Sequence, residues 1–148
     1  MQKLIILSIF IIIFFLKAIA NGSEYFLMLK YKEANVRYGP GFDYPIKFIY
    51  KKKYLPVEII DKKENFRRII DHKKNSGWIH ISQLKKSNSI IVLEDKLLFK
   101  KASKFSEPLV KLKKGRLVKI KKCISDWCKV KADKYLGWID INNVWGRY

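Results

Sequence analysis

The chain has 148 residues, of which 49% are hydrophobic, 30% are charged and 14% are aromatic. Its 32 basic and 13 acidic residues give a formal net charge of +19 at neutral pH. This length suits one ordinary domain or two very small ones and excludes a large multidomain enzyme. The positive field attracts polyanions of any kind, but lysines spread along the chain do not identify a partner.

Residues 1–20 have the order of a secretory signal peptide. Lys3 gives the positive start, residues 4–16 are largely apolar, and residues 18–20 form a small-x-small cleavage pattern. Thirteen residues are few for a membrane-spanning helix, which needs about 20. We therefore expect a periplasmic or secreted protein.

Cleavage is expected after Ala20, so that the mature chain begins at Asn21. An uncleaved N-terminal anchor is the alternative, because Lys17 interrupts the apolar run just before the cleavage site. Removal of residues 1–20 leaves 30 basic and 13 acidic residues, a net charge of +17.

Beyond residue 20, apolar residues alternate with polar ones in short runs, as in residues 57–59, 117–121 and 128–131. Period-two runs rich in Ile, Val, Tyr and Phe indicate half-buried strands. Turn-forming residues separate them at short intervals, at 39–41, 63–65, 74–77 and 125–126. The pattern predicts an all-β fold built from many short strands.

An internal repeat divides this part of the chain. "SGWIHISQL" (76–84) matches "LGWIDINNV" (136–144), "YPIKFI" (44–49) matches "EPLVKL" (107–112), and "NFRRI" (65–69) matches "DWCKV" (126–130). We therefore infer two copies of a unit of about 60 residues and expect domains at 21–86 and 87–148. A unit this small buries only about 60% of its unfolded surface, so we expect each copy to rely on aromatic residues and on its neighbour.

The first copy resembles the bacterial SH3-like domain. The resemblance rests on Asn-Val-Arg-x-Gly-Pro-Gly at 35–41, a Pro-apolar strand at 45–49 and Gly-Trp-Ile at 77–79. The second copy, ending in "GWIDINNVWGRY", is similar to the degenerate second repeat of exported two-copy members. It lacks Gly-Pro-Gly and keeps only Lys100 in the place of the arginine. The resemblance implies two tandem small β-barrels that bind cell-wall peptides or protein partners and do not catalyse a reaction.

The first copy also carries the candidate ligand site. We expect Tyr38, Phe42, Tyr44 and Trp78 to form an aromatic groove, with Arg37 holding a carboxylate or carbonyl of the ligand. Aromatic-lined grooves are how small barrels of this kind bind extended ligands. Because the second copy lacks the same loop, the first copy is the better candidate for binding.

The glycines of "NVRYGPGFDYP" (35–45) indicate a reversing loop. Gly39 and Gly41 are expected to adopt positive φ, and Gly77 is expected to allow a close backbone approach where a strand begins. The loop is not a phosphate-binding loop, because neither a lysine-hydroxyl pair nor a helix follows it.

Cys123 and Cys128 flank a predicted hairpin turn in "CISDWC". In an exported protein this even pair favours a disulfide, with free buried thiols as the alternative. Two cysteines without a neighbouring histidine do not complete a zinc site, and the spacing is too long for a Cys-x2-Cys redox pair. We expect no metal and no cofactor.

No catalytic residue is expected. His72 and His80 are predicted to be surface residues, and the adjacent Glu94 and Asp95 point to opposite faces of a strand. A catalytic domain is not expected either, because the signal segment and two repeats occupy the whole sequence. The sequence therefore favours a protein without enzymatic activity.

The expected function is recognition in the cell envelope, of a peptide, a peptidoglycan component or an envelope protein. Two alternatives remain open. The first is a structural or scaffolding protein whose copies pack on each other or on identical chains. The second is a basic surface protein that adheres to anionic envelope polymers through electrostatic contact. No specific nucleic-acid partner is expected.

Overall fold

The computed structural model describes residues 25–146, and the predicted signal peptide lies outside them. The described residues form fourteen strands and one short 3₁₀ helix, η2 (Ile81–Gln83). The first sheet contains β1 (Tyr25–Leu29), β2 (Ala34–Arg37), β3 (Ile46–Tyr50), β4 (Pro56–Lys63), β5 (Phe66–Ile70), β6 (Ser76–His80) and β7 (Leu84–Lys86). The second contains β8 (Ser89–Val92), β9 (Lys96–Phe99), β10 (Pro108–Leu112), β11 (Leu117–Ile124), β12 (Trp127–Ala132), β13 (Tyr135–Asp140) and β14 (Val144–Trp145).

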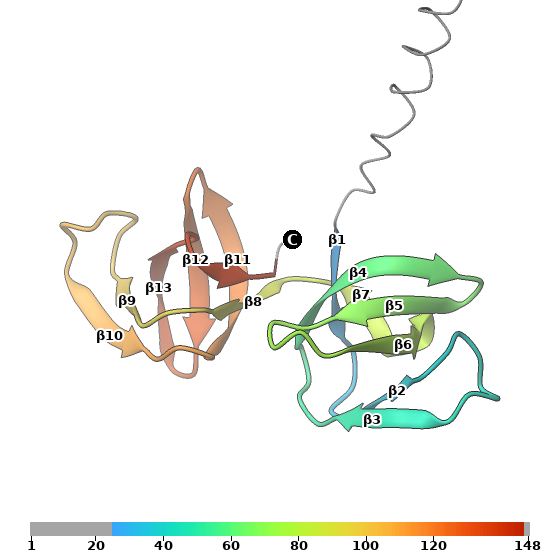
Figure 1. The fold of residues 1–148 in the computed structure, drawn as a ribbon. Helices are drawn as coiled ribbons and strands as arrows, with labels where there is room; N and C mark the ends of the chain where they lie inside the picture. The colour runs from blue at the N-terminus through green and yellow to red at the C-terminus, as the bar shows by residue number, and fades with distance from the viewer. Residues whose placement is uncertain (1–24, 147–148) are drawn as a thin grey trace, which may run out of the picture.

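The two sheets have the same topology, which confirms the tandem repeat. The first has the strand order β3-β2-β6-β5-β4-β1-β7, and the second has β10-β9-β13-β12-β11-β8-β14. Each strand of the second sheet therefore occupies the place of the strand seven numbers earlier. Figure 1 shows the two sheets as separate bodies, coloured blue to green and yellow to red. The all-β prediction is confirmed.

Alternation along each strand places its apolar residues inside. In β12, Cys128, Val130 and Ala132 are buried, whereas the residues between them are half-buried or exposed. In β6, Gly77 and Ile79 are buried, and Trp78 faces the opposite, outer side together with its neighbours two positions away. Successive side chains of a strand point to opposite faces, so the period-two pattern fixes which face is the core.

The register of the sheets corrects one detail of the predicted repeat. Arg37 pairs with Trp78 in the first sheet, and Phe99 pairs with Trp138 in the second. Phe99, and not Lys100, therefore takes the place of the arginine. The loops that follow β2 and β9 span residues 38–45 and 100–107 and have the same length. Pro108 pairs with Phe99 as Ile46 pairs with Arg37, so the match of Pro45 with Pro108 had shifted the alignment by one residue.

Strand β8 belongs to the second sheet but contributes to both cores. All four of its residues are buried. Ile90 and Val92 lie in the core of the second domain, whereas Ile91 lies in the core of the first. Leu117 and Trp145, which pair with Ile91 in the second sheet, also pack against the first core. Residues on one face of the second domain thus complete the core of the first domain.

Polar and aromatic contacts reinforce this junction. The Trp145 indole N–H donates to the Pro56 carbonyl at 3.0 Å, and its ring meets Phe26 edge-on with centroids 5.2 Å apart. The buried Ser89 hydroxyl donates to the Tyr54 carbonyl at 2.6 Å. The expectation that each small unit relies on its neighbour holds here, because the two domains share buried apolar and polar contacts.

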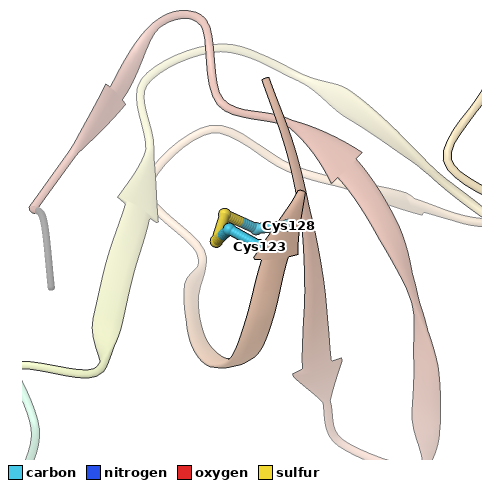
Figure 2. Close-up of a disulfide and its surroundings, with 2 residues drawn as sticks. All are labelled: Cys123 and Cys128. Atoms are coloured by element: carbon cyan, nitrogen blue, oxygen red, sulfur yellow. A yellow bond between two sulfur atoms is a disulfide. The ribbon is translucent and has the colours of Figure 1, made fainter. Parts of the chain in front are cut away.

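The second domain also contains the disulfide predicted from the sequence, between Cys123 and Cys128. Figure 2 shows the bond crossing the β11–β12 hairpin, where the two residues lie directly opposite each other. Cys128 is fully buried and Cys123 packs against the second core. The equivalent pair in the first domain is Lys62 and Arg67, so only one of the two hairpins is cross-linked.

Truncation of the shared residue tests the junction. Ile91→Ala is expected to lower the free energy of unfolding by about 2–4 kcal/mol, because it leaves a cavity among fully buried side chains. Urea denaturation measures the loss, and hydrogen exchange should show faster opening of β6, in the first domain. Ile124→Ala, at a residue that is 58% exposed, is the matched control and should cost less than about 0.5 kcal/mol. Equal losses in the two variants would contradict a shared core.

Reduction tests the contribution of the disulfide. A ring closed by residues five apart in sequence restricts the unfolded chain by about 2 kcal/mol. The oxidised protein should therefore unfold at a temperature roughly 5–10 °C higher than the reduced protein, as measured by calorimetry. Cys123→Ala/Cys128→Ala should show no response to the reductant. An unchanged unfolding temperature on reduction of the wild-type protein would refute the assignment.

Candidate ligand-binding face

The loop between β2 and β3 is held from within by Arg37. Its Nη1 atom donates to the Tyr44 carbonyl at 2.7 Å and to the Phe42 carbonyl at 3.3 Å. The guanidinium carbon also lies 5.5 Å from the centroid of the Phe42 ring. The Tyr38 N–H closes the base of the loop by donating to the Pro45 carbonyl at 3.2 Å. Arg37 therefore fixes the loop, and its predicted role in holding a ligand stays a prediction.

The glycines of this loop serve a different purpose from the one expected. Neither Gly39 nor Gly41 has a positive φ, so the expectation of left-handed backbone was wrong. A Cβ atom on Gly39 would instead overlap the ring of Tyr44, which folds back over the loop. Gly77 meets its expectation, because a Cβ there would overlap Val36 and lie 3.0 Å from the Arg37 carbonyl. The absence of a side chain at these positions makes room for neighbouring groups.

Phe42 joins an aromatic cluster on the outer side of the first sheet. Its ring centroid lies 5.2 Å from that of Phe66 and 5.1 Å from that of His80. Phe66 and His80 are paired residues of β5 and β6, and their rings lie 5.2 Å apart. Phe66 is buried beneath the cluster, whereas Phe42 is 65% exposed. The cluster thus exposes the ring of Phe42, which is supported by the rings of Phe66 and His80.

Of the remaining predicted site residues, Trp78 lies on the same outer face of the sheet, and Tyr38 and Tyr44 lie in the loop between β2 and β3. Trp78 is half-buried and lies between His80 and Ser76 on the outer face of β6. Lys47 donates to the Ser76 carbonyl at 2.9 Å, and its ammonium lies 5.6 Å from the ring of Tyr38. Tyr38 is 62% exposed. We call the surface formed by Tyr38, Phe42, Tyr44, Trp78 and His80 the aromatic face.

Sequence reasoning missed two members of this site. His80 was expected to be a surface residue without a role, but it is half-buried and stacked beside Phe42. Its Nδ1 atom lies 2.8 Å from the Ser82 hydroxyl oxygen. Phe66 is buried, and its ring supports the outer cluster. The available signal was the position of His80, two residues after Trp78 and hence on the same side of a strand.

The second domain does not reproduce the aromatic face. Asp140 replaces His80 and forms an ion pair with the buried Lys96, whose Nζ lies 3.0 Å from the carboxylate. Burial raises the pKa of Asp140, but hydrogen bonding and the charge of Lys96 outweigh it, and the pKa is lowered. In the loop after β9, Phe105 is fully exposed and no ring contact of the described residues involves it. The aromatic face therefore belongs to the first domain.

Replacement of Arg37 separates positioning from ligand contact. Arg37→Met should lower the free energy of unfolding by about 1 kcal/mol, because two loop carbonyls lose a charged donor. It should also speed amide exchange at Tyr38 and Gly41, measured by NMR without any ligand. Arg68→Met, at an exposed arginine paired with the same Trp78, is the control and should leave loop exchange unchanged. Unchanged exchange in Arg37→Met would refute the positioning role.

Comparison with known proteins places the two domains in one family. The model of the bacterial SH3 domain matches residues 30–86 and again residues 96–146. No curated protein sequence matches the chain. The fold is similar to the solved structure of NlpC2 from Trichomonas vaginalis, with a TM-score of 0.39 and 10% identity over 86% of this chain and 50% of that one.

A second similar structure is NlpC1 from the same organism, with a TM-score of 0.39 and 11% identity over 84% of this chain and 46% of that one. The chain thus spans about half the length of these two proteins. The first matched segment covers β2–β7 and the second covers β9–β14. The chain belongs to the bacterial SH3 domain family and contains two tandem copies of the domain.

Proposed function

We propose that this protein is a non-catalytic binding protein of the cell envelope. Its first domain recognises an extended peptide or a peptidoglycan component on the aromatic face. Bacterial SH3 domains are binding modules, which makes recognition the starting point. The observation that carries the proposal is the exposed aromatic surface of Tyr38 and Phe42, which are 62% and 65% exposed, on a loop held rigid by Arg37.

The aromatic face has the properties of a recognition surface. Aromatic side chains bring a large contact area at a low cost in side-chain entropy, and they are enriched among residues that dominate binding energy. Arg37 and the backbone bond at the loop base fix the loop before any ligand arrives. A surface organised in advance loses less entropy on binding, so more of the contact energy becomes affinity.

The packing of the two copies favours recognition over a purely structural role. The junction between the domains is built by Ile91, Leu117 and Trp145, on a different part of the first sheet from the loop. Tyr38 and Phe42 stay exposed when both domains are in place. A scaffold formed by the two copies alone would therefore leave the aromatic face unused.

Several observations support a location outside the cytoplasm and a role without catalysis. Disulfides persist in oxidising compartments, and the bond between Cys123 and Cys128 fits the export expected from residues 1–20. The same disulfide removes both cysteines as thiolate nucleophiles, and His80 is packed against Phe42. The periplasm or the exterior is the proposed location.

Sedimentation with purified peptidoglycan tests the proposal. Tyr38→Ala and Phe42→Ala should each weaken binding by roughly tenfold, the loss typical of an aromatic residue central to an interface. Tyr31→Ala is the matched control, because Tyr31 is 49% exposed and lies in the loop between β1 and β2, away from the face. Envelope extract serves as a second bait. Equal binding by all three variants to both baits would reject the aromatic face as the site.

A further inference from the structure

The junction between the domains leaves a cleft of about 500 Å³. Lys85 and Lys86 of β7 line it from the first domain, and Lys121 and Lys122 of β11 line it from the second. We call these four lysines and the space between them the basic cleft. None of the residues that line it in the described part of the chain is acidic. The cleft exists only because the two domains are docked on each other.

A second cluster of lysines adjoins the basic cleft through Lys85. The ammonium groups of Lys119, Lys85 and Lys53 lie 3.6, 4.7 and 5.0 Å from the centroid of the Tyr54 ring. Hydrogen bonding to Lys53, together with the charge of Lys119, lowers the pKa of Tyr54. Cation–π contacts with one shared ring hold lysines of both domains close together despite their mutual repulsion.

Within residues 25–146, no ion pair involves a lysine of the basic cleft. The ion pairs within residues 25–146 involve cations of the second domain only: Lys96, Lys100, Lys111, Lys113 and Arg116. Lys86 and Lys121 are exposed, so their ammonium groups are accessible to a ligand from solution. Lys122 is also exposed, and its ammonium lies 5.7 Å from the centroid of the Trp138 ring.

We propose that the basic cleft binds the phosphate groups of a polyanionic polymer. Each lysine ammonium is a compact charge with three hydrogen-bond donors, which suits phosphate oxygens. The lysines come from two strands and two domains, so they spread their charge along the cleft and match a chain with repeated negative groups. The positive charge of the whole chain draws such a polymer toward the surface. This site is separate from the aromatic face and does not depend on the proposed function.

Titration of the exported chain with sodium polyphosphate tests the proposal. Lys86→Gln/Lys121→Gln removes one exposed lysine from each side of the cleft and avoids the lysines that contact Tyr54. We expect at least tenfold weaker binding and a slope of log affinity against log salt that is shallower by one to two. Lys62→Gln/Lys104→Gln is the matched control, with the same loss of charge from one exposed residue in each domain outside the cleft. It should weaken binding by less than threefold.

Two further measurements complete the test. Lys86→Arg/Lys121→Arg keeps both charges and should keep the affinity, which excludes a folding defect as the cause of the loss. Binding to vesicles of phosphatidylglycerol is measured as a second arm beside the polyphosphate titration. The arm in which the glutamine variant loses binding shows whether the phosphate comes from a polymer or from a lipid headgroup. Equal losses in the cleft and control variants, or no loss in either arm, would overturn the proposal. Tyr38→Ala should bind polyphosphate normally, so failure here is distinct from failure of the aromatic face.

Discussion

The insertion of one strand into two cores is the constraint on which the rest of this structure depends. Ile90 and Val92 point into the second domain, and Ile91 between them points into the first. A domain of about 60 residues buries a small share of its surface and is therefore only marginally stable. Because successive side chains of a strand point to opposite faces, one strand can add apolar residues to both cores. Two marginal domains thereby become one unit in which a single strand contributes to both cores.

The two copies have diverged in what their outer faces do. At equivalent positions the first has His80 beneath an exposed phenylalanine, and the second has Asp140 paired with a buried lysine. An ion pair needs both partners to be well placed, because an isolated buried charge is strongly destabilising. The second domain therefore uses this position for its own architecture, and also carries the disulfide. The first uses the position to pack the His80 ring against Phe42, and the second supplies the support.

The sequence predicted the strands and the repeat, because these follow from local alternation and spacing. The rest depended on contacts that no local pattern encodes. The bonds of Arg37 to loop carbonyls arise only once the loop has folded, and the need for glycine at position 39 comes from the ring of Tyr44. Ile91 lies in an apolar run, and the pattern of the run does not indicate which of the two cores Ile91 enters. The match of Pro45 with Pro108 placed Lys100, and not Phe99, opposite Arg37, although Pro108 takes the place of Ile46 in the sheet.

The position of Trp145 has a consequence for how the chain is made. Every strand of the first sheet has been synthesised by residue 86, yet three residues that close its core, Ile91, Leu117 and Trp145, come later. The first domain therefore cannot reach its final packing while the rest of the chain is still being synthesised. Domains usually fold in order from the N-terminus as they emerge, but here completion waits for the last strand. Such a delay makes the two domains together, and not the first domain alone, the unit that folds.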